Sequence, residues 1–250
     1  MTPVSSAQPG ALRDAWRTIV PDLDGADGPL PPLLLALTFV TGLVDSVSFL
    51  QLGHVFVANM TGNIVFVAFA LAGTRDFDLW ASIIALGAFV LGAMLAGRIG
   101  FAVRHRGRHL LLVVAAETVL VLATCAFTWH YGIPEAGWER DLVILLLGIA
   151  MGAQSATARQ LAVADLNTTV LTQTLAGMSA DSALAGGSGG HAGRRLLAVL
   201  TMILGAFTGA ALVLHAHTVS TLVLATALLA VTALVTGSTA RTNRRWTIPK

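Results

Sequence analysis

Long apolar stretches separated by short polar connections dominate this sequence. A membrane-spanning helix needs about 20 mainly apolar residues, and eight stretches reach or approach that length. These stretches are Leu33–Leu50, Val55–Ala72, Trp80–Val103, Leu110–Trp129, Leu142–Val163, Leu166–Ala180, Leu196–His215 and Thr218–Gly237. The pattern predicts an all-α integral membrane protein.

Polar residues interrupt two of the eight stretches. Asn59–Asn63 divides Val55–Ala72, and Leu166–Ala180 is short and rich in threonine and amide side chains. Irregular backbone persists at membrane depth only where protein buries it or water reaches it. We therefore expect both stretches to be broken or re-entrant, which leaves six spans.

The distribution of lysine and arginine distinguishes the possible topologies, because cytoplasmic loops are enriched in these residues. Six spans with a cytoplasmic N-terminus place 13 of them inside and leave Arg75 and Arg140 outside. Eight spans give 10 against 5. Seven spans, with only Leu166–Ala180 re-entrant, give 11 against 4 with the N-terminus outside and form the alternative.

Composition narrows the class of protein further. Of the 250 residues, 55% are hydrophobic and 11% are charged, which excludes an ordinary soluble enzyme, a disordered chain and a nucleic-acid binder. The single cysteine and the scattered histidines predict no metal site, and we expect no cofactor. We divide the chain into a cytoplasmic tail over 1–32, one membrane domain over 33–238 and a basic cytoplasmic tail over 239–250.

The two halves of the membrane domain, about 33–130 and 142–238, resemble each other. The aligned pairs are Gly42–Ser46 with Gly152–Ala156, Met60–Ile64 with Leu171–Leu175, and Leu86–Phe89 with Leu204–Phe207, at offsets of 110, 111 and 118 positions. Each half then holds three spans and one broken segment, so the second half inserts upside down. Such inverted 3+3 repeats are typical of transporters, with the site at the broken segments. Alternatively, both breaks are packing features.

Asp45 is the strongest candidate for a functional side chain in the first span. Thr38, Thr41, Asp45 and Ser48 lie at spacings of three, four and three positions, so four polar residues share one helix face. A carboxylate at the centre of a span costs about 2.5–3.5 kcal/mol, and we expect it to face protein or water. It is either a solute, cation or proton site or a structural hydrogen-bonding group.

The broken segments supply further candidates for substrate binding. The ends of half-helices expose N–H or C=O groups that bind ions and polar solutes. The candidates are Asn59, Thr61, Gly62 and Asn63 in the first half and Thr172, Gln173 and Thr174 in the second. If the two breaks meet near the midplane, they form a polar constriction.

Three more polar residues on the spans complete the candidate set. Ser155 and Arg159 lie on the span equivalent to that of Asp45. Arg159 either pairs with Asp45 across the pseudo-twofold axis or extends to the cytoplasmic interface. Glu117, about two turns into its span, is either a proton relay or a hydrogen-bonding group between helices.

Two sequence blocks are similar to a known family. Thr41–Phe49 (TGLVDSVSF) followed by Ala58–Asn63 (ANMTGN) resembles the YoaK family of bacterial multi-pass membrane proteins, whose domain is labelled as of unknown function (1275). The resemblance extends to Gln154–Arg159 and Asp165–Thr172 and covers essentially Leu33–Gly237. It implies a protein of the bacterial cytoplasmic (inner) membrane and supplies no substrate, reaction or catalytic residue.

These observations predict a transporter or channel for a small solute or ion, with a polar site near the first span and the two breaks. One alternative is a membrane-embedded enzyme acting on a lipid or isoprenoid, although the cytoplasmic loops lack carboxylate-rich or histidine-rich clusters. The second alternative is a non-catalytic scaffold or sensor. We expect no enzymatic activity, and we expect the lipid bilayer and a small solute as partners. GxxxG patterns permit a homo-oligomer.

Overall fold

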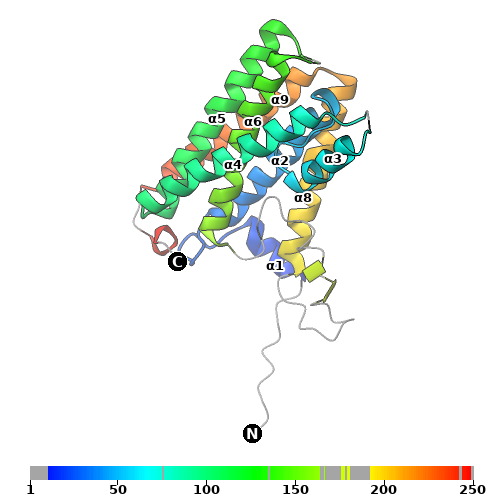
Figure 1. The fold of residues 1–250 in the computed structure, drawn as a ribbon. Helices are drawn as coiled ribbons and strands as arrows, with labels where there is room; N and C mark the ends of the chain where they lie inside the picture. Colours follow the sequence, from blue (N-terminus) through cyan, green and yellow to red (C-terminus); the bar gives the residue numbers. More distant parts are fainter. Residues whose placement is uncertain are drawn as a thin grey trace.

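A computed structural model shows a bundle of long helices (Figure 1). It describes residues 11–74, 76–134, 136–163, 166, 176–177, 179–180, 192–241 and 244–248. This part of the chain forms eight α-helices and a 3-10 turn, with no β-strand. Six helices are long and apolar enough to cross a membrane: α2 (Leu30–Gln51), α4 (Leu79–Ala102), α5 (Arg106–Tyr131), α6 (Trp138–Leu161), α8 (Ala192–His215) and α9 (Thr218–Thr239). The predicted all-α membrane fold is confirmed, and each predicted span agrees with its helix to within four residues at either end.

Helix length separates the spans from the other elements. The six long helices have 22 to 26 residues, so they measure about 33–39 Å and exceed the roughly 30 Å hydrocarbon core of a bilayer. The apolar helix α3 (Met60–Leu71) has 12 residues and measures about 18 Å, too short to span. Helix α1 (Ala11–Ile19) and the 3-10 turn η2 (Arg245–Thr247) lie in the two tails.

Hydrogen bonds around Arg106 identify one face of the bundle. Its guanidinium donates to the carbonyl oxygens of Ala26 (3.1 Å), Trp246 (3.2 Å) and Leu161, and it pairs with Asp27 (3.3 Å). These partners lie before α2, after α9 and at the end of α6, and Arg106 itself begins α5. We call this side of the molecule the Arg106 face. The described parts of both tails lie on it (Figure 1).

Arg140 identifies the opposite face, which we call the Arg140 face. Its guanidinium lies 2.8 Å from the carboxylate of Asp78, the residue that caps the start of α4, and 3.4 Å from Asp141. Gly53, two residues after the end of α2, approaches the same guanidinium, because a β-carbon there would lie 3.2 Å from it. Helix α3 therefore leaves from this face and returns to it. The first broken segment is therefore re-entrant. The seven-span alternative, in which Val55–Ala72 crosses the membrane, is wrong.

Helices α2 and α6 form the centre of the bundle. Within their most apolar stretches 67% and 56% of residues are buried, against 39% or less in the other four spans. The most extensive helix contacts of the described chain are α4 with α6 and α2 with α8. The outer helices α4, α5, α8 and α9 expose large apolar side chains, among them Phe101, Trp129, Phe207 and Leu234. This arrangement suits helices that contact lipid on one side and the central pair on the other.

Candidate polar site inside the bundle

Asp45 is held by the loop that follows its own helix. Its carboxylate oxygen Oδ1 accepts hydrogen bonds from the backbone N–H groups of Val57 (3.0 Å) and Ala58 (2.8 Å). Oδ2 accepts a hydrogen bond from the side-chain amide of Asn59. The side chain is 4% exposed. The carboxylate thus satisfies backbone donors that an irregular loop would otherwise leave unpaired inside the membrane.

Asn63 makes a second connection to the same loop. Its amide oxygen accepts the N–H of Phe56 (2.9 Å), and its amide nitrogen donates to the Phe56 carbonyl (2.5 Å). The chain is irregular from Leu52 to Asn59, and α3 begins at Met60. The predicted break over Asn59–Asn63 is therefore placed too late. A polar residue in the first turn of α3 pairs with the preceding loop and does not interrupt the helix.

Aromatic rings pack around this loop. The ring of Phe56 stacks on Phe49 of α2 at 4.9 Å and on Phe66 of α3 at 5.9 Å, and Phe66 stacks on Phe77 at 4.5 Å. Gly62 is required beside them, because a β-carbon there would lie 2.7 Å from the Phe56 ring. The structure brings these predicted site residues together as a network that holds the re-entrant segment.

The other predicted residues lie apart from Asp45. The hydroxyl of Ser48 donates to the backbone carbonyl of Asp45 (3.1 Å) and does not contact its carboxylate. Thr61 is exposed on α3, and Ser155 is half-buried on α6. Arg159 is exposed near the end of α6 on the Arg106 face and forms no ion pair with Asp45, so the predicted pairing of these two residues is wrong. Thr172, Gln173, Thr174 and most of the second predicted break lie outside the described residues.

A second polar contact joins the two central helices. The side-chain amide of Gln154, 1% exposed on α6, donates to the hydroxyl of Thr41 on α2 (2.7 Å) and to the carbonyl of Leu37 (3.4 Å). Its amide oxygen Oε1 is buried without a hydrogen-bond partner. Sequence reasoning included Thr41 but missed Gln154. The signal was present, because an amide side chain inside a span belongs to the repeat block Gly152–Ala156.

Glu117 has a different environment from both contacts. It lies on the buried face of α5, which packs mainly against α9 and α6, and it is 1% exposed. Both of its carboxyl oxygens are buried without a hydrogen-bond partner. The predicted alternative of a hydrogen bond to a neighbouring helix is therefore wrong.

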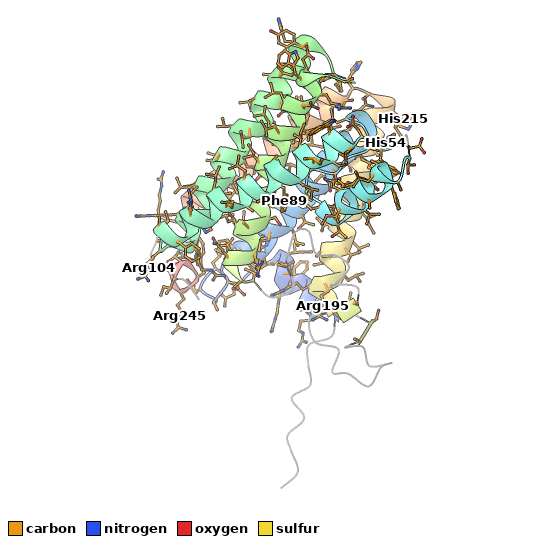
Figure 2. All side chains as sticks on the ribbon, viewed as in Figure 1. His54, Phe89, Arg104, Arg195, His215 and Arg245 are labelled. Atoms are coloured by element: carbon orange, nitrogen blue, oxygen red, sulfur yellow. The ribbon has the colours of Figure 1, made fainter. Side chains whose placement is uncertain are left out.

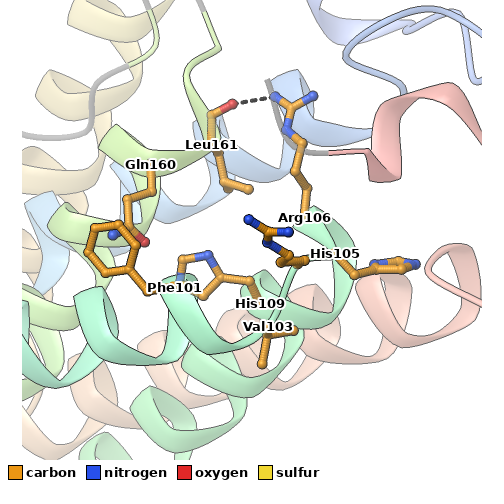
Figure 3. Close-up of a pocket in the computed structure, with 9 residues that line it drawn as sticks. Phe101, Val103, His105, Arg106, His109, Gln160 and Leu161 are labelled. Carbon is orange, nitrogen blue, oxygen red and sulfur yellow. Dashed lines mark hydrogen bonds between the residues drawn. The ribbon is translucent and has the colours of Figure 1, made fainter.

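A hollow of about 350 Å³ opens on the Arg106 face between the ends of α4, α5 and α6 (Figure 3). Its lining residues are Gly100, Phe101, Val103, Arg104, His105, Arg106, His109, Gln160 and Leu161. Four of the nine carry basic or imidazole side chains and none is acidic, and one of the four, Arg106, pairs with Asp27. Figure 3 also shows the hydrogen bond from Arg106 to the Leu161 carbonyl. Spacing along the sequence gave no sign of this hollow.

Comparison with known proteins identifies the family. A family model described as "Protein of unknown function (DUF1275)" matches residues 33–235. The chain belongs to the DUF1275 family. This DUF1275 protein is 33% identical over 153 residues to the UPF0700 transmembrane protein YoaK of Bacillus subtilis (strain 168). The alignment covers 60% of the chain and 65% of YoaK, a little under two thirds of the relative. No solved structure matches the chain. The resemblance to the YoaK family noted in the sequence is confirmed.

Proposed function

We propose that this DUF1275 protein is a transporter or channel for a small polar solute or ion, and not an enzyme. In this proposal two inverted halves surround a polar site between α2 and α6. One observation carries the proposal: two close contacts between α4 and α6 have counterparts at equivalent positions between α8 and α2, so contacts between the halves recur when each helix is exchanged for its counterpart in the other half.

Glycines mark the first pair of corresponding contacts, one between α6 and α4 and one between α2 and α8. A β-carbon on Gly152 of α6 would overlap the carbonyl oxygen of Phe89 on α4, and one on Gly42 of α2 would lie 2.7 Å from that of Met202 on α8. These two contacts correspond if α2 maps onto α6 with an offset of 110 positions and α4 onto α8 with an offset of 113.

A second pair of contacts follows the same two offsets. A β-carbon on Gly92 of α4 would overlap the carbonyl oxygen of Ile149 on α6, and one on Gly205 of α8 would overlap that of Phe39 on α2. The bounds of α4 and α8 also differ by 113 positions at both ends. The sequence alignment of Leu86–Phe89 with Leu204–Phe207 uses an offset of 118 positions. It therefore differs by five positions from the offset of 113 that the helix contacts give.

The directions of the helices support an inverted relation between the halves. Helix α2 runs from the Arg106 face to the Arg140 face, and its counterpart α6 runs the opposite way. Helix α8 begins on the Arg106 face, where the backbone N–H of Arg194 donates to Asp14 of α1 (3.0 Å), whereas α4 begins at the Arg140 face. Transporters with inverted repeats bind their solutes near the midplane, at the interface of the two halves.

Gln154 and Thr41 are the best candidates for that solute site. They join the two central helices, one from each half. A buried amide oxygen without a partner costs about 1–3 kcal/mol, and a solute that donates a hydrogen bond to Gln154 Oε1 would offset this cost. Both oxygens of Asp45 already accept hydrogen bonds, so we assign Asp45 to holding the loop and not to direct solute binding.

The arginines favour one orientation in the membrane. In the described chain the Arg106 face and its helix ends carry Arg13, Arg17, Arg98, Arg104, Arg106, Arg108, Arg159, Arg194, Arg195, Arg241, Arg244 and Arg245. Figure 2 shows Arg104, Arg195 and Arg245 at this end and the labelled His54 and His215 at the other. By the positive-inside rule the Arg106 face, with both tails, is cytoplasmic, and we propose the bacterial inner membrane as the location.

Accessibility of the proposed site from both sides of the membrane tests the proposal without a known solute. In a Cys125→Ala background, Thr41→Cys and, as a buried apolar control on the same helix, Val40→Cys are treated with a membrane-impermeant thiol reagent. We expect Thr41→Cys to react in both intact cells and inside-out vesicles, and Val40→Cys in neither. Protection of Thr41→Cys in both preparations of folded protein would contradict the proposal.

A further inference from the structure

We infer that Glu117 exchanges a proton with water during transport, along a path past the buried threonine hydroxyls of α5 and α9. This inference rests on the proposed transport function and adds the coupling ion to it.

The packing of α5 on α9 fixes how deep Glu117 lies within the helix bundle. The two helices run in opposite directions, and two close contacts set their register. A β-carbon on Gly107 would lie 2.8 Å from Cβ of Ala240, and one on Gly237 would lie 3.6 Å from the side chain of Leu111. This register brings Glu117 level with the middle of α9. Eleven residues separate it from the start of α5, which is about 16 Å along the helix axis.

No described residue offsets the cost of burying the Glu117 carboxyl group with a hydrogen bond or an ion pair. An ionised carboxylate with neither an ion pair nor a hydrogen bond costs several kcal/mol in the protein interior. Both oxygens of Glu117 lack a partner, so the arrangement described here is that of a neutral carboxylic acid. An apolar side chain would be more stable at this position, and nothing in the described packing offsets the difference.

On the described elements packed against α5, charged groups lie far from the level of Glu117 along the helix axes. Helix α9 contains no titratable residue. The charged residues of the other elements lie at or near helix ends: Arg98 in α4, Glu139, Arg140, Asp141 and Arg159 in α6, and Arg245 in η2. Within α5, Arg106, Arg108, His130 and Tyr131 lie in the end turns. The nearest titratable groups within α5, His109 and Cys125, are each eight residues away, about 12 Å along the axis.

Buried hydroxyl groups of α5 and α9 lie on both sides of the level of Glu117 along the helix axes. Thr232 and Thr236 of α9 lie toward the Arg106 face, and Thr124 and Thr128 of α5 lie toward the Arg140 face. Each hydroxyl donates to a carbonyl of its own helix, at 2.6 to 3.0 Å. Their oxygens therefore retain a lone pair that can accept a hydrogen bond from water.

The proposed step is a proton transfer that uses only water and Glu117. When water enters from one face, the O–H bond of the carboxyl group breaks and a water molecule accepts the proton. The carboxylate later takes a proton from hydronium, and the O–H bond forms again. Hydration of the threonine hydroxyls stabilises the ionised form while it exists. No oxidant, reductant or metal ion takes part.

Infrared difference spectroscopy on the purified protein in lipid nanodiscs tests this inference with the proton as the only probe. Glu117→Gln removes the carboxyl group, and Glu139→Gln is the matched control on the membrane surface. We expect a protonated-carboxyl C=O band that weakens as pH rises, is absent in Glu117→Gln and persists in Glu139→Gln. A Glu117 band that does not respond to pH, or an unchanged spectrum in folded Glu117→Gln, would overturn the inference.

Two further variants test the path past the buried hydroxyls. Thr232→Val removes a buried hydroxyl without changing the size of the side chain, and Thr226→Val removes a half-buried one elsewhere on α9. After a pH step, we expect the Glu117 band to respond several-fold more slowly in Thr232→Val and at the wild-type rate in Thr226→Val. Equal rates in both variants would overturn the proposed path.

The outcomes distinguish this inference from the proposed function. Reaction of Thr41→Cys from both faces together with a Glu117 that stays protonated at all pH values would leave transport and remove proton coupling. A Glu117 that titrates in a protein whose Thr41→Cys stays protected from both faces would leave the proton site and remove the transport proposal.

Discussion

In the described part of the chain, Asp45 and Glu117 carry carboxyl groups inside the helix bundle, and the surroundings of the two groups are opposite. Asp45 and Glu117 are both almost completely buried, at 4% and 1% exposure. The two oxygens of Asp45 accept three hydrogen bonds from the loop before α3. The two oxygens of Glu117 accept none.

The difference follows from the backbone beside each group. Asp45 lies next to an irregular loop whose N–H groups have no helical partner and need an acceptor. Glu117 lies between regular helices, whose N–H groups are already bonded within each helix. The same functional group therefore stabilises the fold at one position and costs free energy at the other. Burial alone does not separate a structural carboxyl from a functional one.

Removing the acceptor at Asp45 should give the largest effect. Asp45→Ala leaves the N–H groups of Val57 and Ala58 and the amide of Asn59 without their acceptor, and we expect it to lower the free energy of unfolding by about 3–5 kcal/mol. Unfolding in mixed micelles, followed by circular dichroism, measures this. Ser48→Ala, which removes one hydroxyl from the same helix, is the control and should cost less than about 1 kcal/mol. A loss below that level for Asp45→Ala would contradict the assigned role.

A smaller effect is expected at Asn63, on the other side of the same loop. Asn63→Ala removes the amide that pairs with both backbone groups of Phe56, and the expected loss is about 2–3 kcal/mol in the same unfolding measurement. Thr61→Ala changes an exposed residue in the same turn of α3 and should leave stability within about 0.5 kcal/mol. Equal losses of unfolding free energy in the two variants would contradict the role assigned to the Asn63 amide.

Asp78 shows how a carboxyl group behaves outside the membrane. Burial would raise its pKa, but hydrogen bonds from the Ala81 N–H and Arg140, together with the charge of Arg140, lower the pKa below its usual value. The unfolded chain then binds more protons in acid, so the stabilisation is present above about pH 4 and is lost as pH falls further. Asp78→Asn should remove this pH dependence and cost about 0.5–1 kcal/mol at neutral pH. An unchanged slope of stability against pH in that variant would exclude Asp78 as its source.

The helices could be predicted from the sequence because hydrophobicity over 20 residues decides what spans a membrane. The predicted stretch Thr218–Gly237 became Thr218–Thr239, and Leu33–Leu50 became Leu30–Gln51. The re-entrant course of the first break followed from the distribution of arginines. Its position did not, because Asn63 looks like a helix-breaking residue until its partner Phe56 is known.

The partners of the polar side chains required the tertiary structure. Asp45 and Asn59 are 14 positions apart, and helical periodicity cannot show that the loop folds back onto α2. Gln154 contacts Thr41 across the interface of the two halves, 113 positions away. Glu117 was identified from the sequence as a carboxyl in a span, but its lack of a partner depends on how α5 packs against the neighbouring helices.

The central claim is that one buried carboxyl supports the fold and the other does not, and one matched comparison tests it. Asp45→Asn and Glu117→Gln make the same chemical change, from carboxyl to amide, and both are unfolded in the same micelles. We expect Asp45→Asn to lose about 1–3 kcal/mol, because the new amide N–H₂ faces the amide donor of Asn59. Glu117→Gln should stay within about 0.5 kcal/mol of the wild type, since neither group has a partner. A stable Asp45→Asn beside a strongly destabilised Glu117→Gln would contradict the account.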